Sequence, residues 1–160
     1  MAALDWDDMV RHHGHRIPVL GSVMSVIDIG PLHAAAGPVF VFLHGNPTSS
    51  FLWRKVIAAL AGRYRCIAID LIGMGRSGKP DIGYSWADHR AYLTETIDRL
   101  DVGTQPVRLV THDWGVGLGI VRPHASAPCG GSGIRRRPPP TAAIVGSFRR
   151  RRPRALPSAA

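Results

Sequence analysis

This 160-residue sequence has little cysteine, no long apolar run and no acidic residue near its C-terminus. Its two cysteines, Cys66 and Cys129, are too few and too far apart to predict a framework of disulfide bonds. No apolar stretch approaches the roughly 20 residues that a membrane-spanning helix needs. The acidic start, residues 1–8, lacks the basic and apolar regions of a signal peptide. We therefore expect a cytoplasmic protein without a membrane partner.

The net charge of +9 comes from the last forty residues. Up to Ile120 the eleven Asp and Glu residues balance the eleven Lys and Arg residues. Residues 121–160 contain nine Arg, seven Pro and no Lys, Asp or Glu, with few large apolar side chains to offset the entropy of ordering. We expect residues 121–160 to form a disordered tail. Such a tail would bind polyanions weakly and in a salt-dependent way, but no specific nucleic-acid-binding pattern accompanies it.

Short apolar runs separated by turn residues indicate the strands. Residues 17–29, rich in Val, Ile and Met, predict two short strands or a hairpin. Val39–Leu43, Cys66–Ile69 and Val107–Val110 are continuous apolar runs, which are typical of strands buried on both faces of a parallel sheet.

Two helices are predicted between these strands. The first begins at Thr48 or Ser49, either of which can cap it, and ends at Gly62; the second spans Trp86–Leu100. Strands that alternate with helices predict an α/β fold with a mostly parallel sheet over residues 17–120, after an N-terminal extension of residues 1–16. The apolar residues at helical spacing are Leu52, Val56, Ile57 and Leu60 in the first helix and Tyr92, Leu93, Ile97 and Leu100 in the second.

The third apolar run leads directly into His112-Asp113-Trp114-Gly115. A strand, a sharp turn of this pattern and a helix form the nucleophile elbow of α/β-hydrolases, which lifts the central side chain above the sheet. The central residue here is Asp113, and a carboxylate nucleophile attacks saturated carbon to give an alkyl ester. The residues therefore indicate displacement at an alkyl halide or an epoxide. A simple helix-capping role for Asp113 is the alternative.

Three segments, in this order and at plausible spacing, resemble the motifs of haloalkane dehalogenases. They are His44–Arg54, Asp70–Ser77 and His112–Gly115, and the similarity runs from about Val23 to Ile120. One such motif alone is weak, but three together are specific. The resemblance implies a partial α/β-hydrolase fold that is truncated after the nucleophile elbow.

The resemblance also implies roles for individual residues. Asp113 is then the nucleophile, and Asn46 and Trp114 donate side-chain N–H groups to the departing halide, which needs fixed donors in a dry pocket. His44 and Gly45 shape the loop that presents the backbone N–H of Asn46 as part of an anion hole. The substrate is a small haloalkane, with no cofactor and no metal. Plain turn formation by Asn46 and core packing by Trp114 stay open as alternatives.

An epoxide hydrolase is the alternative enzyme. It shares the fold and the Asp-Trp-Gly turn, but it typically has an aromatic residue where this chain has Asn46. The sequence does not indicate which haloalkane or epoxide is the substrate, or which oligomeric state the protein adopts.

The resemblance implies an acid and a histidine base after the nucleophile, in that order. No Asp or Glu follows Asp113, and His124 is the only later histidine, too early in the chain to be the base. We therefore expect neither a general base nor a catalytic acid, and no sustained turnover. Degenerate codons for residues 121–134, read displaced by one nucleotide, can encode a family-like continuation. This predicts a frameshift near Ile120, which resequencing of the gene would test.

Other polar residues are predicted to be structural. Asp70 ends a strand and is expected to hold a loop, and Cys66 is expected to be a buried small apolar residue. Five histidines without motif context are predicted to lie on solvated faces: His12, His13, His15, His33 and His89.

Overall fold

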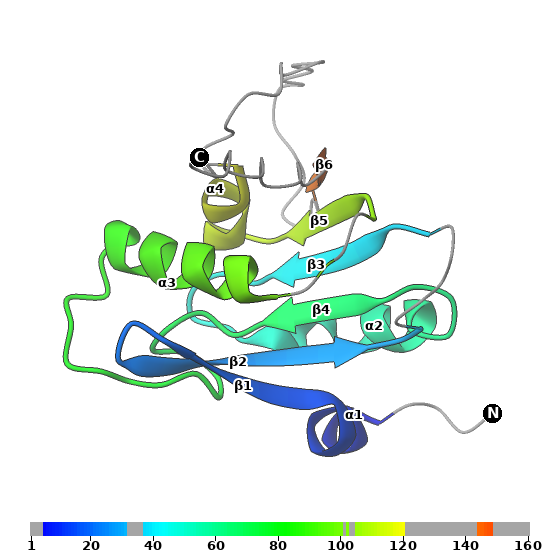
Figure 1. Ribbon diagram of the computed structural model, residues 1–160, viewed down its shortest axis with the longest axis horizontal. Helices are drawn as coiled ribbons and strands as arrows, with labels where there is room; N and C mark the ends of the chain where they lie inside the picture. Colours follow the sequence, from blue (N-terminus) through cyan, green and yellow to red (C-terminus); the bar gives the residue numbers. More distant parts are fainter. Residues whose placement is uncertain (1–4, 32–36, 101, 103–104, 121–143, 149–160) are drawn as a thin grey trace, which may run out of the picture.

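The computed structural model describes residues 5–31, 37–100, 102, 105–120 and 144–148, the last five by their backbone. They form a sheet in the order β1-β2-β4-β3-β5-β6, with helices on both faces (Figure 1). In chain order the elements are α1 (Trp6–His13), β1 (Gly14–Val19), β2 (Ser22–Ile29), β3 (Val39–Leu43), the 3-10 helix η1 (Ser50–Trp53), α2 (Arg54–Leu60), β4 (Cys66–Ile69), α3 (Trp86–Arg99), β5 (Val107–Thr111), α4 (Trp114–Ile120) and β6 (Ile144–Phe148).

The three apolar runs form the parallel centre of the sheet. β3 pairs in parallel with β4 on one side and with β5 on the other. The predicted α/β class is confirmed, because the connections between these strands run through α2 and α3. The antiparallel pairings lie outside this centre, where β2 joins β1 and β4 and where β6 joins β5.

The predicted hairpin is confirmed and is longer than the apolar run suggested. β1 and β2 are joined by Leu20 and Gly21, which have φ angles of 48° and 74°. Two residues with positive φ between paired strands form the tight turn that matches the right-handed twist of a hairpin. Val19 therefore pairs directly with Ser22.

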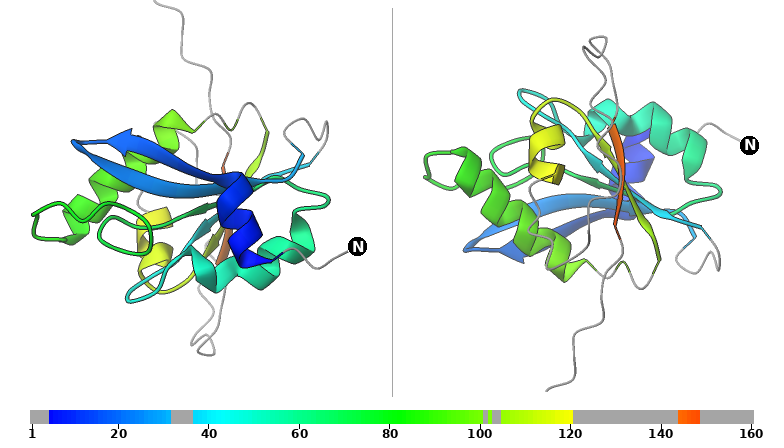
Figure 2. Two further views of the ribbon diagram at one scale, coloured as in Figure 1. Left: turned by 90° about the horizontal axis from the view of Figure 1, so that it is seen from below. Right: turned by 90° about the horizontal axis from the view of Figure 1, so that it is seen from above.

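Alternation along the strands divides the core into two layers, one on each face of the sheet. In β3, Val41 and Leu43 face the layer that α3 and α4 cover, while Phe42 faces the layer that α1 and α2 cover. Figure 2 shows these two helix pairs on opposite sides of the sheet. The central strands thereby bury most of their apolar side chains on both faces, which explains their continuous apolar runs.

The prediction of a separate N-terminal extension over residues 1–16 is wrong for its described part. α1 covers the second layer and places Met9 there with no exposed surface. β1 begins at Gly14, inside the predicted extension. The eight residues of α1 are mostly polar, so a single buried Met gave too weak a sequence signal.

The helix after Ser49 differs from the prediction. Ser49 is the cap, and its Oγ accepts from the Phe51 N–H at 3.4 Å, but the first turn is the 3-10 helix η1 and α2 follows it. Leu52 and Val56 are exposed. The buried face is formed instead by Trp53, Ile57 and Ala61. Their spacing of four residues places them on one side of the helix, and the bulk of Trp53 decides which side turns inward.

The prediction of a disordered tail over residues 121–160 is wrong for residues 144–148. This short segment forms β6, paired antiparallel with β5 from Ile144 opposite Thr111 to Phe148 opposite Val107. The rest of the tail, with Cys129 and His124, lies outside the described residues. In the described part of the chain, no helix is both long and apolar enough to cross a membrane.

Candidate active site

The turn between β5 and α4 places Asp113 above the end of the sheet. Asp113 has a φ of 51°, in the left-handed region that non-glycine residues rarely adopt. Hydrogen bonds fix the turn on both sides: the His112 N–H donates to Leu43 O and the Gly115 N–H to His112 O, each at 3.0 Å. A Cβ atom at Gly115 would lie 2.3 Å from Leu43 O, so only glycine fits there. Asp113 thus lies at a tight turn between β5 and α4, and the nucleophile elbow stays a prediction.

The Asp113 carboxylate is held by backbone N–H groups. The Asn46 N–H donates to Asp113 Oδ1 at 2.9 Å. Hydrogen bonds from the backbone of Trp114 and then of Asn46 lower the pKa of the Asp113 carboxyl below its usual value, since both favour the charged form. Asp113 is therefore an anion at neutral pH, and its side chain is exposed.

The loop after β3 passes directly against this carboxylate. A Cβ atom at Gly45 would lie 2.3 Å from Asp113 Oδ1 and 2.7 Å from the Trp114 nitrogen. The close approach explains why a glycine precedes Asn46. The structure thus brings together residues 44–46 and 113–114, which the sequence analysis had assigned to one site.

His44 is completely buried beneath this loop and braces it. Its Nδ1 donates to Gly45 O at 2.8 Å, and its Nε2 accepts from the Leu71 N–H at 2.9 Å. Both contacts require the neutral ring with its proton on Nδ1. Burial lowers the pKa of His44, which keeps it in that state. His44 therefore positions the loop and does not itself face Asp113.

Asp70 has the structural role that the sequence predicted. Its carboxylate accepts from the Ser50 N–H at 2.7 Å and from the Arg76 N–H at 2.9 Å. Its backbone oxygen accepts from Ser77 Oγ at 2.6 Å, and that Oγ accepts from the Ser25 N–H. Asp70 thereby ties the Gly-rich loop after β4 to η1 and β2.

Trp114 is half-buried and lies between two residues of the first turn of α3. The Trp86 and Trp114 rings are 5.8 Å apart, and the His89 and Trp114 rings are 5.3 Å apart in an edge-to-face arrangement. A Cβ atom at Gly117 would meet the Trp86 ring at 2.4 Å, so α3 contacts the backbone of α4 directly. The position of Trp114 is therefore set by α3 as well as by its own turn.

The prediction that His89 is solvated is wrong. His89 is 1% exposed, and burial lowers its pKa. A sequence signal was available, since His89 precedes the buried Tyr92 and Leu93 by three and four residues and so shares their helix face. Of the other four histidines, His12 and His15 are exposed, His13 is half-exposed, and His33 lies outside the described residues.

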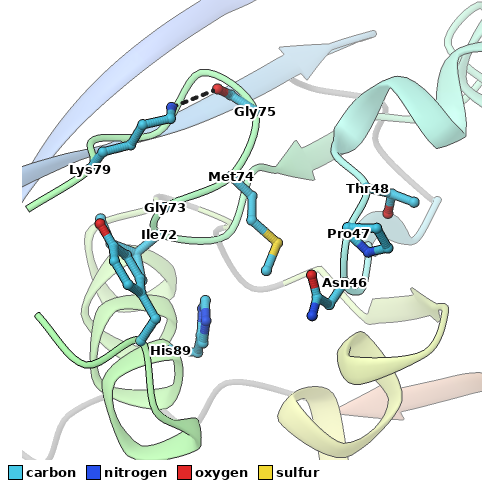
Figure 3. A pocket seen from close by; sticks show the side chains of 10 residues that line it. Asn46, Pro47, Thr48, Ile72, Gly73, Met74, Gly75, Lys79 and His89 are labelled. Atoms are coloured by element: carbon cyan, nitrogen blue, oxygen red, sulfur yellow. Dashed lines mark hydrogen bonds between the residues drawn. The ribbon is translucent and has the colours of Figure 1, made fainter.

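A cavity of about 580 Å³ opens beside Asn46. Asp113 and Trp114 are not among its lining residues. Figure 3 shows the side chains of Asn46, Met74 and His89 directed toward this space. Several loop residues among its walls lie in the motif segments His44–Arg54 and Asp70–Ser77, but the sequence did not predict that they share one cavity. The lining consists of Asn46, Pro47, Thr48, Ile72, Gly73, Met74, Gly75, Lys79, Tyr84 and His89.

Within the described residues, no group of three or more His, Cys, Asp or Glu side chains is arranged to hold a metal ion. The donors at this site are instead neutral N–H groups gathered around one carboxylate. Such an arrangement can place a nucleophilic oxygen and hydrogen-bond donors next to a small neutral molecule.

The comparisons with known proteins agree with this geometry. A haloalkane dehalogenase of Mesorhizobium japonicum is 52% identical over 103 residues, which cover 64% of this chain and 31% of that protein. A haloalkane dehalogenase of Sphingobium indicum is 47% identical over 108 residues, 65% of this chain and 34% of that protein. The chain spans about a third of the length of these curated relatives.

Solved structures give the same result. The crystal structure of a haloalkane dehalogenase from Bradyrhizobium elkanii matches with a TM-score of 0.59 and 44% identity, over 66% of this chain and 35% of that one. One from Agrobacterium tumefaciens matches with a TM-score of 0.59 and 39% identity, over 67% and 34%. The family model described as alpha/beta hydrolase fold matches residues 38–119, which is half of the chain. The chain belongs to the alpha/beta hydrolase fold family and resembles the haloalkane dehalogenases within it.

Proposed function

We propose that this chain carries the nucleophile and the halide donors of a haloalkane dehalogenase. Asp113 is the nucleophile of a nucleophile elbow, and the side chains of Asn46 and Trp114 bind the departing halide. The names of the similar proteins support the reaction class. One observation carries the assignment of the nucleophile: the exposed Asp113 carboxylate accepts from the Asn46 N–H at 2.9 Å. Hydrogen bonds from the backbone of Trp114 and then of Asn46 also lower its pKa.

The chemistry of the first step follows from that carboxylate. An oxygen of Asp113 attacks the carbon that bears the halogen, and the new C–O bond forms as the carbon–halogen bond breaks. The bonding electron pair leaves with the halide. The products are an alkyl ester on Asp113 and a halide ion, and no proton is transferred. The N–H donors of Asn46 and Trp114 stabilise the charge that develops on the halogen.

His44 and Gly45 support this step indirectly. Gly45 leaves room for the loop to reach the carboxylate, and His44 holds that loop through Gly45 O and Leu71 N. A donor fixed before the reaction needs no reorganisation when charge develops, which is the usual source of such stabilisation.

The second step, hydrolysis of the ester, requires a water activated by a base. In this sequence no Asp or Glu follows Asp113, and the one later histidine, His124, lies outside the described residues. We infer that the 160-residue chain reacts once and retains the ester. The frameshift near Ile120 stays a prediction, which the end of the family match at residue 119 supports.

The experiment is incubation of the chain with 1-bromobutane, followed by mass spectrometry and bromide measurement. We expect the mass of one butyl group to be added on the peptide that contains Asp113, with no more than one equivalent of bromide released. Asp113→Asn is the matched control, because it keeps the size of the side chain and removes the anion. Absence of an adduct would contradict the nucleophile assignment, and sustained bromide release would contradict the single reaction.

No observation favours the two alternatives from the sequence. Epoxide opening would use the same Asp113, and the haloalkane test separates the two substrate classes. The Arg residues that suggested polyanion binding lie outside the described residues. The cytoplasmic location stays a prediction.

A further inference from the structure

His89 is a buried polar residue, and one nitrogen of its ring has no hydrogen-bond partner within the described residues. Its Nδ1 is fully enclosed and has no partner among the described residues, although the ring is 1% exposed. An unpaired buried polar atom of this kind costs about 1–3 kcal/mol. Since Nδ1 has no partner there, the part of His89 that the described residues do use is its ring, through the contact with Trp114.

The His89 ring contacts Trp114 and also lines the cavity. It contacts Trp114 edge-to-face, with ring centroids 5.3 Å apart and an interplanar angle of 89°. It also lines the cavity together with Asn46 (Figure 3). The side chain that the proposed function assigns to the halide is thus in direct contact with His89.

The first turn of α3, which contacts Trp114, is fixed by a capping box. Ser85 and Asp88 form a capping box: the Asp88 N–H donates to Ser85 Oγ at 3.2 Å, and the Ser85 N–H donates to Asp88 Oδ2 at 2.8 Å. This anchors the turn that carries Trp86 and His89. Trp114, by contrast, opens the short helix α4 and is half-buried, so its ring orientation depends on what it packs against.

We propose that His89 is a positioning residue for the Trp114 indole, whose orientation it sets together with Trp86. The inference rests on the proposed halide-binding role of Trp114. An edge-to-face contact fixes the angle of a ring more narrowly than an aliphatic contact does, because the electrostatics of two rings favour particular angles. A donor that is displaced by even a small angle loses much of its effect on a small anion.

The test is bromide binding to the whole chain, followed by NMR of the indole N–H signals after isotope labelling of tryptophan. Trp114→Phe identifies the Trp114 signal by its loss. Sodium bromide should shift that signal in a saturable way. His89→Leu, which removes the ring and keeps an apolar side chain, should move the Trp114 signal before bromide is added and weaken bromide binding about tenfold or more. His89→Ala is a second variant without a ring, so the result does not depend on the folding of one protein.

His89→Phe should restore the Trp114 signal and most of the bromide affinity, because it returns an aromatic edge. Tyr92→Phe is the matched control on α3, since it removes only the 3.1 Å hydrogen bond from the Tyr92 hydroxyl to Leu20 O. It should leave bromide binding unchanged. If His89→Leu or His89→Ala folds and binds bromide as tightly as the unsubstituted chain, the positioning role of His89 is wrong. The halide role of Trp114 is then unaffected. No bromide response in the unsubstituted chain overturns the halide role of Trp114, and this inference with it.

Discussion

The backbone N–H of Asn46 donates to Asp113 Oδ1 at 2.9 Å, joining two residues that are 67 positions apart in the sequence. The parallel pairing of β3 and β5 makes this contact, since Leu43 lies opposite Thr111 and the loops after both strands leave the same edge of the sheet. Together with the hydrogen bond from the Trp114 backbone, this contact favours the charged form of the carboxylate, and Asn46 also lines the cavity. The geometry of the site thus depends on the register of two buried strands.

Gly45→Ala should disrupt this contact. The added Cβ would lie 2.3 Å from Asp113 Oδ1, so the loop or the Asp113 turn must move. We expect alkylation by 1-bromobutane to be lost, with a decrease of about 1–3 kcal/mol in the free energy of unfolding, measured by urea denaturation. Gly62→Ala is the control: nothing lies within 4 Å of its Cβ position, so it should change stability by less than about 1 kcal/mol. Equal effects of the two substitutions would contradict the role of the close approach.

The rate of alkylation should depend little on pH above the range where Asp113 titrates. Hydrogen bonds from the backbone of Trp114 and Asn46 lower the pKa of Asp113, so it stays ionised to a lower pH than an ordinary aspartate. We expect a constant rate of adduct formation between about pH 5 and pH 8, measured by mass spectrometry in timed samples. A rate that falls steadily from pH 8 to pH 5 would indicate that another titrating group controls the reaction.

The buried histidines should make the protein less stable in mild acid. Burial lowers the pKa values of His44 and His89 in the folded state below their ordinary value of 6.5. Below about pH 6.5 the unfolded chain therefore binds more protons than the folded protein does. The histidines' contribution to the free energy of unfolding is fully present above that pH and decreases as the pH falls. The urea midpoint should fall between about pH 7 and pH 5, and less so in His89→Phe. His12→Gln, at an exposed site, should leave the pH dependence unchanged; a midpoint independent of pH would count against this explanation.

The ion pair between Asp28 and Arg65 should stabilise the pairing of β2 with β4. Arg65 donates to both carboxylate oxygens, at 2.8 and 2.6 Å, and the two side chains are 13% and 11% exposed. Asp28→Asn should cost about 1–3 kcal/mol of unfolding free energy, because it removes the ion pair between the Asp28 carboxylate and the Arg65 guanidinium. Glu95→Gln, which breaks an exposed pair with Arg99, should cost less than about 1 kcal/mol in the same urea measurement. Similar losses would show that burial does not strengthen the Asp28 pair.

The pattern of apolar residues predicted secondary structure correctly where the whole segment lies in the core. The continuous apolar run of β3 could only be a strand buried on both faces, and the structure gives it the predicted bounds, Val39–Leu43. Periodicity failed where bulk decided the outcome, as in the segment where Trp53 turned inward and left Leu52 and Val56 exposed. It also missed α1, whose mostly polar sequence fully buries Met9 and packs Trp6 and Val10 partly against the core.

The sequence by itself determined the chemical types at the site. An aspartate in an Asp-Trp-Gly turn after a strand, with Asn46 after His-Gly, specifies a carboxylate and N–H donors. Only the tertiary structure decided their relations. It placed Gly45 against the Asp113 carboxylate, buried His44 as a brace, and set His89 against Trp114. These contacts join residues from separate strands and helices, so they arise from sheet register and helix packing, which no local pattern encodes.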